Sequence, residues 1–480
     1  MEEEIRKEFM EMIKLLDEGR LQEFKQKATE CPPVDIAEGL EEIEDEGRVL
    51  RVFRMLPKDI SSDVFSYMTS EQQQLIAESA TNAELKALVD DMFMDDTVDF
   101  LEEMPANVVK KVLQNADEGT RKTINQFLNY PENSAGSLMT IEYVDLHDYF
   151  TVRKAMDYIR RTGIDKETVY TCYVIDDQRR LVGQVSLRKL IIAPESACIR
   201  DIMDTNIVSA VTTDDQEAVA DDFRRYDLTS VAVCDKENRL VGIITIDDIV
   251  DVIQDENTED IKKMAAIIPS DEDYMKTSVW SLVAHRLPWL MLLMISATFT
   301  STIITHFETL LSGAVLLTAF IPMLMDSAGN SGSQTSVTVI RNLALGEIEL
   351  RDWPHVLAKE IGVAVVSGAA LALVNFLRII IFTSTSMMIA AVVSVTLFCT
   401  VIIAMIVGCL LPIGAKKLGF DPAVMASPMI TTIVDACSLM IYFLIATSML
   451  GLLEKYSPPI KDKASRCRAC SAAAGGLFCV

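Results

Sequence analysis

The sequence has little positive charge and very little histidine, and both shortages exclude functions. Its 480 residues include 44 Lys and Arg against 70 Asp and Glu, a formal net charge of −26. Nucleic-acid binding needs a basic surface, so we expect no nucleic-acid partner. With only four histidines, the chain shows neither a nucleophile–base pair nor a phosphate-binding glycine loop followed by Lys-Ser/Thr. We therefore do not expect an enzyme.

Acidic residues are also scarce in the second part of the chain. Of the 70, 60 precede Leu282 and 10 follow it, which indicates an acidic soluble part followed by a membrane part. The N-terminal MEEEIRKEFMEM lacks the basic and apolar regions of a cleaved signal. Cys467 and Cys470 have the spacing of metal ligands but no second pair or histidine nearby. A zinc site is therefore not expected.

Five apolar stretches in the second part are each long enough to cross a hydrocarbon core of ~30 Å, which takes ~20 residues. They cover residues 287–304, 313–340, 356–381, 387–413 and 429–453. Basic residues in the loops 341–359 and 416–419 favour the cytosolic side. We therefore expect a multi-pass protein of the inner (plasma) membrane with a cytoplasmic N-terminus.

The stretch 321–340, IPMLMDSAGNSGSQTSVTVI, is polar although it lies inside an apolar region. It contains Pro322, Asp326, Gly329, Asn330, Gly332 and Gln334. Such groups are costly in lipid and must face protein or a water-filled path, and Pro and Gly loosen a helix. The stretch therefore predicts an interrupted, pore-lining helix. Asp326 either faces this path or caps the broken helix.

Asp435 lies inside the last apolar stretch, where a charge at mid-bilayer costs ~2.5–3.5 kcal/mol or more. Thr431, Thr432 and Ser438 add oxygen atoms on nearby faces, and the same stretch contains no Lys or Arg. The alternatives are a hydrogen bond between helices and a cation site, which we favour. An oxygen-only site suits Mg²⁺, Ca²⁺ or Mn²⁺. Asp421, just before this stretch, is better interpreted as a helix cap.

The first part of the chain contains two regions with different sequence patterns. Residues 2–129 are amphipathic helices with an internal repeat, since RMLPKDISSDVFSYM is similar to EEMPANVVKKVLQNA. From residue 135, short strands and helices occur in two copies of about sixty residues. VYTCYVID and RRLVGQVSL in the first copy correspond to TSVAVCD and NRLVGIITIDDIVDVI in the second. These copies resemble a pair of CBS domains, which usually sense a nucleotide or an ion.

Three acidic clusters lie in the first part of the chain. They comprise Asp90, Asp91, Asp95, Asp96 and Asp99; Asp214, Asp215 and Glu217; and Asp247, Asp248, Asp251, Asp255, Glu256, Glu259 and Asp260. A solvated face is the default interpretation of such a run. However, three acidic surfaces on adjoining domains would repel one another unless divalent cations bridged them, which makes an ion-sensing switch plausible.

The order of these parts resembles the MgtE family of magnesium channels and transporters over nearly the whole chain, to about Leu453. The most specific stretches are PMLMDSAGNSGSQ, LRDW and DPAVMASPMITTIVD. The resemblance implies an all-α N-terminal superhelical domain (1–130), an α/β tandem CBS pair (131–254), a connecting plug helix (255–284) and an α-helical transmembrane pore domain with five helices (285–454). The tail, 455–480, matches nothing known in the family.

The resemblance also implies a homodimer in the lipid bilayer, with one central pore in which Asp435 holds hydrated Mg²⁺. Mg²⁺ bound between the cytosolic domains would close this pore. Carried over by position, the regulatory ligands are Asp95, Asp99, Asp215, Glu217, Asp227, Asp248, Asp251, Glu256, Glu259 and Asp260, with Asp63 as a weaker match. The residues expected to line the pore are Asp326, Gly329, Asn330, Gly332, Gln334, Thr431 and Asp421.

The expected function is therefore Mg²⁺ transport into the cytosol, gated closed by Mg²⁺. The alternatives are a broader divalent-cation (Mn²⁺, Co²⁺) transporter, a sodium-coupled exporter, and a nucleotide sensor whose membrane part is mainly an anchor. The polar stretch 321–340 argues against an anchor. Lys189 stands where a nucleotide-binding CBS domain usually has Asp, and only Asp248 keeps the acid. This departure makes ATP modulation doubtful.

Overall fold

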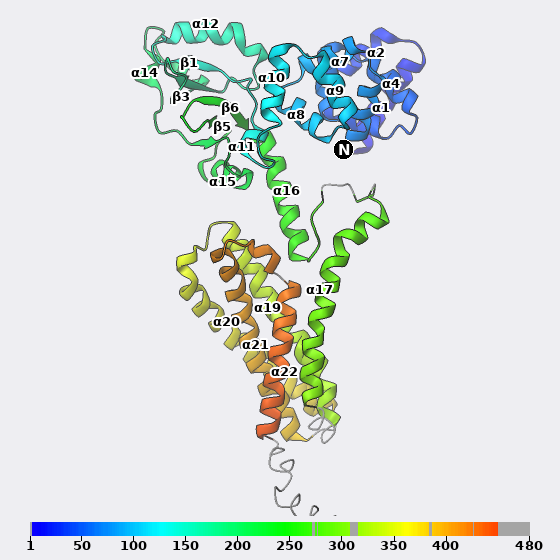
Figure 1. Ribbon diagram of the computed structural model, residues 1–480, viewed down its shortest axis with the longest axis vertical. Helices are drawn as coiled ribbons and strands as arrows, with labels where there is room; N and C mark the ends of the chain where they lie inside the picture. Colours follow the sequence, from blue (N-terminus) through cyan, green and yellow to red (C-terminus); the bar gives the residue numbers. More distant parts are fainter. Residues whose placement is uncertain are drawn as a thin grey trace, which may run out of the picture. The chain divides into compact units, whose positions relative to one another are not determined.

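The computed structural model describes residues 2–270, 274–275, 277–307, 315–383, 386–425 and 427–449 (Figure 1). It divides into two compact units, Met1–Gln254 and Asp255–Val480, and we describe each by itself. The boundary between them falls inside helix α16 (Ile246–Met264). The tail with Cys467 and Cys470, for which we expected no zinc site, lies outside the described residues.

The first unit begins with short helices joined by tight turns. They are α1 (Glu2–Asp17), α2 (Leu21–Glu30), α3 (Pro33–Glu41), α4 (Glu46–Met55), α5 (Lys58–Ser66), α6 (Ser70–Ser79), α7 (Asn82–Asp91), α8 (Met94–Glu103), α9 (Ala106–Asn115) and α10 (Glu118–Phe127). The repeated Leu/Met-Pro motif marks equivalent helix starts, because Pro57 and Pro105 immediately precede α5 and α9. The predicted all-helical N-terminal domain is confirmed.

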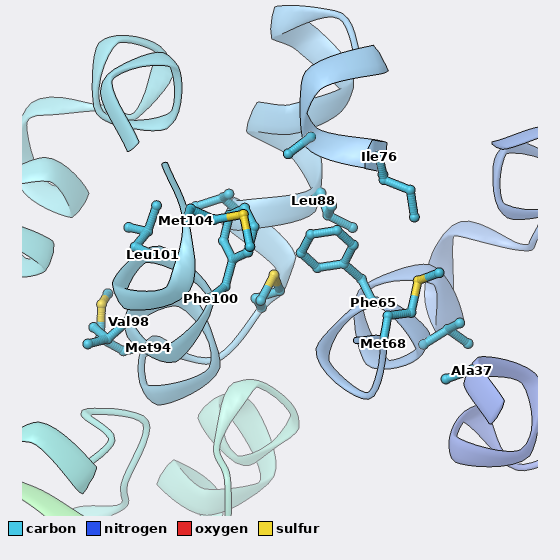
Figure 2. Close-up of a cluster of buried hydrophobic side chains, with 14 of the residues drawn as sticks. Ala37, Phe65, Met68, Ile76, Leu88, Met94, Val98, Phe100, Leu101 and Met104 are labelled. Atoms are coloured by element: carbon cyan, nitrogen blue, oxygen red, sulfur yellow. The ribbon is translucent and has the colours of Figure 1, made fainter. Parts of the chain in front are cut away.

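An apolar core runs through these helices (Figure 2). Phe65 of α5 packs edge to face against Phe100 of α8, with ring centroids 5.0 Å apart. The same core includes Ile244 and Ile249 from the end of the first unit. The helical domain and the second β–α copy therefore share one core. This packing sets the position of α8 relative to the start of α16.

Two three-stranded sheets follow, and they have the same topology. The strands are β1 (Asp145–His147), β2 (Thr171–Ile175) and β3 (Leu181–Ser186), then β4 (Ser209–Val211), β5 (Ser230–Cys234) and β6 (Leu240–Thr245). In each sheet the first strand is parallel to the second, and the second is antiparallel to the third. The register shifts after Val174 in one sheet and after Val233 in the other. The predicted tandem duplication is confirmed.

Short helices connect and cover these strands. They are α11 (Ala135–Leu138), α12 (Val152–Thr162), η1 (Gly163–Asp165), α13 (Leu187–Ile192), α14 (Ile199–Ile202), α15 (Gln216–Tyr226) and the start of α16. In the second copy, β6 runs directly into α16, and the Thr245 hydroxyl donates a hydrogen bond of 2.8 Å to Asp248 at the helix start. The strand thereby fixes the position of an acidic residue predicted to be functional.

The second unit is helical in the described residues. Its elements are α17 (Val279–His306), η2 (Val315–Phe320), α19 (Ile321–Ala344), η3 (Leu350–Asp352), α20 (Trp353–Phe382), α21 (Met387–Lys417), η4 (Pro422–Met425) and α22 (Ser427–Met449). Among the residues that the structure describes, four segments are long and apolar enough to cross a membrane: Val279–His306, Leu350–Phe382, Met387–Lys417 and Pro428–Met449. The remaining predicted crossing, 313–340, contains most of α19, whose 24 residues span ~36 Å. The polar residues of α19 lower its hydropathy, so it is not among these four apolar segments.

The prediction that residues 321–340 form an interrupted helix is wrong, because α19 is continuous through them. Pro322 lies in the first helical turn, where its missing N–H breaks no helical hydrogen bond. Gly332 is buried between α21 and α22: a Cβ there would lie 3.1 Å from the Ala404 carbonyl oxygen and 3.0 Å from a methyl of Ile430. This glycine allows close helix packing and does not break the helix.

Candidate functional site

The two acids predicted inside the membrane part come together through α19 and α22, which pack side by side in the bundle (Figure 1). Asp326 lies in the second turn of α19, and Asp435 lies near the middle of α22. They are close enough for their charges to interact. Thr431, one turn before Asp435, places its methyl 3.2 Å from where a Cβ on Gly329 would lie. The pair therefore lies near a close contact between α19 and α22.

Helix α19 has two distinct faces. Asp326, Asn330 and Gln334, spaced four residues apart, are exposed in the single chain. Gly332 and Ser336 lie on another face and are buried against neighbouring helices. Since residues four apart lie on one side of a helix, the exposed residues form a polar stripe. We call Asp326, Asn330 and Gln334 the α19 polar face.

The other residues expected to line the pore have different surroundings. Gly329 and Gly332 are buried in helix contacts and lie off the polar face. The Thr431 hydroxyl donates to the Pro428 carbonyl oxygen at 3.0 Å. Asp421 precedes η4, where its Oδ1 accepts a hydrogen bond of 2.8 Å from the Ala423 N–H. That contact is the capping role expected for it.

Sequence reasoning overlooked a further acid in the membrane part, Glu360. Thr335 of α19, whose exposed fraction is 2%, donates a hydrogen bond of 3.0 Å to Glu360 Oε2 on α20. Glu360 lies within the predicted stretch 356–381. A charged residue inside an apolar stretch was therefore the signal that could have revealed it. The hydrogen bond ties α19 to α20 on a side of α19 away from the polar face.

In the first unit, acidic residues of α8 lie near the start of α16. Asp95 is 9% exposed, and burial together with the charge of Asp248 raises its pKa well above the ordinary value. The same two causes raise the pKa of Asp96 to about 6. Asp99 keeps contact with solvent, but its pKa is also raised, by partial burial and by Asp248. The predicted ligands Asp95, Asp99 and Asp248 are therefore brought near one another.

Asp248 itself is partly buried, and burial raises its pKa to about 6 although the Thr245 hydroxyl opposes this. Asp63, on α5, lies close enough to influence Asp96. Its own pKa is raised by burial and by Asp59. The weaker sequence match at Asp63 thus belongs to the same negatively charged region.

Glu167 is a member of this region that the sequence did not reveal. Its Oε2 atom is buried and has no hydrogen-bond partner. Burial, followed by Asp247 and Asp248, raises the pKa of Glu167 to about 7. It lies in the connection between η1 and β2, outside every acidic run, so sequence position gave no signal. We call Asp95, Asp96, Asp99, Glu167 and Asp248 the α8–α16 acid cluster.

The chemistry of the α8–α16 acid cluster suits a hard divalent cation, because its donors are carboxylate oxygens. Burial and mutual repulsion raise the pKa of each member, so a bound cation would relieve a cost that the fold carries. Within the part of the chain that the structure describes, however, no three His, Cys, Asp or Glu residues are placed to hold a metal ion together. The acids are concentrated here without forming a ready coordination shell.

The remaining predicted ligands lie on α15 and along α16. Asp215 caps the start of α15 by accepting a hydrogen bond of 2.9 Å from the Glu217 N–H, and Asp227 ends the helix with a left-handed φ of 51°. The eleven residues of α15 span ~16 Å, so one ion cannot contact both Asp215 and Asp227 of one chain. On α16, Asp251 is exposed, and Glu256, Glu259 and Asp260 are partly buried within the second unit.

Asp260 and Glu259 have a basic neighbour that the acidic pattern concealed. Lys263 Nζ lies 2.8 Å from Glu259 Oε1 and 2.8 Å from Asp421 Oδ2. Burial and the charge of Asp421 raise the pKa of Asp260, while Lys263 acts in the opposite direction. At the C-terminal end of α16, one lysine thus lies among three carboxylates, those of Glu259, Asp260 and Asp421.

The fold and these sites define a class: a polytopic helical membrane protein with a polar helix face and intramembrane acids, joined to a helical domain and a tandem CBS-type module. The family models agree with this description. Residues 321–445 match the MgtE model, described as a divalent cation transporter, residues 31–133 match the MgtE intracellular N domain, and residues 135–196 and 199–255 match CBS domains.

Whole-length relatives show the same relationship. The chain is 34% identical to the magnesium transporter MgtE of Thermus thermophilus over 439 residues, covering 91% of this chain and 97% of that protein. It is 32% identical to the Bacillus subtilis magnesium transporter MgtE, covering 92% and 98%. The crystal structure of the soluble part of a magnesium transporter covers 52% of this chain and 99% of its own, with a TM-score of 0.50 and 28% identity. The chain belongs to the MgtE family.

Proposed function

We propose that this protein carries Mg²⁺ across the plasma membrane into the cytosol and that Mg²⁺ on the cytosolic side closes the path. The observation that carries the proposal is that Asp435 of α22 lies close enough to Asp326, a member of the α19 polar face, for their charges to interact. Carboxylate, amide and hydroxyl oxygens are ligands for Mg²⁺, which keeps several of its waters when bound. Family membership and the magnesium transport of the named relatives support the choice of ion.

The α19 polar face also supports a homodimer. Asp326, Asn330 and Gln334 are exposed in the single chain although the surrounding helices are apolar enough for a membrane. Lipid cannot satisfy these groups. A second copy that faced the first across its own polar face would enclose a water-filled path, with Asp435 of each chain beside it.

Closure by Mg²⁺ follows from the charge of the cytosolic part. The α8–α16 acid cluster holds carboxylates in surroundings that raise their pKa values, and the clusters on α15 and α16 extend the negative charge. Divalent cations would reduce this repulsion and favour the closed arrangement. Nucleotide regulation is not part of the proposal, because Lys189 takes the position of the expected acid.

The test is Mg²⁺ uptake into proteoliposomes under an inside-negative potential, with low Mg²⁺ on the cytosolic side. We expect uptake by the native protein, loss of uptake in Asp435→Asn, and suppression of native uptake by millimolar cytosolic Mg²⁺. Glu347→Gln is the matched control, since it neutralises an exposed acid in the connection after α19. Its uptake should equal that of the native protein.

The alternatives predict other results in the same assay. Uptake of Mn²⁺ or Co²⁺ at equal rates would indicate a broader divalent-cation transporter, and a strict sodium requirement would indicate an exchanger. If the native protein moved none of these ions, the proposed transport function would be wrong and a sensory function would take its place.

A further inference from the structure

The C-terminal end of α16 is fastened to the segment before α22 by a lysine. Lys263 Nζ lies 2.8 Å from Glu259 Oε1, one turn earlier on the same helix, and 2.8 Å from Asp421 Oδ2, just before η4. The lysine side chain is 23% exposed. Two short, partly buried contacts to carboxylates are stronger than an isolated surface ion pair. The hydrogen bonds to Asp421 and Glu259 raise the pKa of Lys263 although partial burial opposes this, so it stays charged.

Neighbouring contacts show that this pairing belongs to a packed junction. Met264 packs against Ile340 of α19 and Ala423 of η4. Arg341, also at this end of α19, donates a hydrogen bond of 2.9 Å to the Asn257 side chain of α16. The last turns of α16 therefore contact the C-terminal end of α19 and the segment before α22. We call the contact of Lys263, Glu259 and Asp421 the Lys263 bridge.

The charge balance at this junction depends on Lys263. Glu259, Asp260 and Asp421 lie close together, and the burial and charges around Asp260 raise its pKa even with the lysine present. Without the lysine, three carboxylates would face one another with no cation between them. Such an arrangement is repulsive unless a metal ion supplies the missing positive charge.

We propose that Lys263 is a tethered cation that holds α16 against the pore helices in the absence of Mg²⁺. It occupies the space between Glu259 and Asp421 that a bound Mg²⁺ would otherwise bridge. The junction therefore stays in contact without metal, while Mg²⁺ controls the opening and closing of the path at the other acidic clusters. The inference rests on the proposed function, because it makes Lys263 a positioning residue that keeps α16 in contact with the helices of the proposed Mg²⁺ path.

The first test measures the junction directly and needs no transport. Spin labels at Ile261 and Leu418, both exposed, would report the distance between the end of α16 and the segment before α22 in the full chain, after replacement of accessible native cysteines. In Mg²⁺-free solution we expect a narrow distance distribution in the native background and a longer, broader one in Lys263→Gln. Added Mg²⁺ should restore the narrow distribution in Lys263→Gln.

Three further variants separate the bridge from general effects. Lys262→Gln is the matched control, because its amine contacts the Ser270 carbonyl oxygen and not the bridge. Lys263→Arg keeps the charge and should retain the native distribution. Asp421→Asn keeps the oxygen that caps η4 but removes the charge, so it should broaden the distribution without recovery in Mg²⁺. If Lys263→Gln matched Lys262→Gln, the inference would be overturned.

The second test is ion flux. In proteoliposomes with low cytosolic Mg²⁺, Lys263→Gln should conduct roughly three- to tenfold more than the native protein, the range expected for loss of a partly buried charge pair. Its flux should also fall more steeply as cytosolic Mg²⁺ is raised. If the native protein carries no Mg²⁺, the proposed function fails while the distance measurement still decides the role of Lys263. Unchanged flux and distance in Lys263→Gln would reject the bridge and leave transport intact.

Discussion

Gly408 of α21 lies directly against the backbone of Gly332 of α19. A methyl group on Gly408 would collide with the Gly332 carbonyl oxygen, and the carbonyl of Ala404, one turn earlier, lies close to Gly332 on the same side. Small residues on both helices thus allow their backbones to touch, a common arrangement in membrane helix pairs. This contact fixes the rotation of α19 and with it the direction of the α19 polar face.

The first prediction concerns this contact. Gly408→Val should destabilise the detergent-solubilised protein by ~1–3 kcal/mol, the usual cost of forcing extra atoms into a packed core. The effect would be measured by thermal unfolding, with the fraction of protein that remains monodisperse on size-exclusion chromatography as the readout. Gly414→Val on the same helix is the control, because nothing lies within 4 Å of a Cβ there. If both variants were destabilised equally, the loss of stability would come from the helix propensity of valine and not from the contact between α19 and α21.

The second prediction concerns the hydrogen bond between Thr335 and Glu360. Thr335→Val should lower stability by ~1–3 kcal/mol, because it leaves a partly buried carboxylate without its hydroxyl donor. Thr335→Ser keeps the hydroxyl and should restore most of the loss. Thr338→Val serves as control, since that exposed hydroxyl bonds only to the Gln334 carbonyl of its own helix. The prediction fails if Thr335→Val and Thr338→Val unfold at the same temperature.

The third prediction concerns pH and the α8–α16 acid cluster. The pKa values of Asp96 and Asp248 are raised to about 6 and that of Glu167 to about 7. The folded state therefore binds more protons than the unfolded state above pH ~4, and stability falls as pH rises through 6 to 7. Ionisation of each group lowers the free energy of unfolding by on the order of 1 kcal/mol after allowance for solvent screening.

Thermal unfolding of the Mg²⁺-free full chain should therefore show a higher midpoint at pH 5.5 than at pH 7.5, and Mg²⁺ should raise the midpoint more at the higher pH. Glu167→Gln should reduce this pH dependence. Asp157→Asn, which alters an exposed ion pair with Arg160, should leave it unchanged. A stability that rises between these two pH values would contradict the assignment.

The fourth prediction concerns the α19 polar face. Asp326→Asn removes a negative charge close to Asp435 and should weaken the attraction for a divalent cation. We expect the half-saturating Mg²⁺ concentration for uptake to rise roughly three- to tenfold, a loss of about 1 kcal/mol. Asn330→Asp adds a charge on the same face and should lower that concentration. Changes of the same sign in both variants would mean that the face does not act through charge.

Several features could be read from local sequence. Repeated proline-started helices, the two β–α copies and the apolar stretches each depend on neighbouring residues, and the structure and family models confirm them. Asp435 could be singled out because a charge inside an apolar stretch is costly wherever the helix points. Asp421 could be interpreted as a cap because capping is also local.

Other features depended on which residues meet. Glycines in 321–340 suggested a broken helix, but Gly332 serves a crossing with a helix more than seventy residues later. Glu167 showed no signal, because it stands alone in sequence and joins the acids only when the first CBS copy packs near α8 and α16. Lys263 was passed over beside an acidic run, although it pairs with a residue 158 positions away.

The sequence by itself determined the order of domains, the membrane part and the identity of the acids, because each of these follows from composition and periodicity along a short stretch. The tertiary structure decided which face of α19 is polar and exposed and which carboxylates lie close together. It also decided which carboxylates form an ion pair with a lysine of the same chain. Those outcomes depend on long-range packing, since burial and Coulomb interactions act between atoms that are near in space however far apart they lie in sequence.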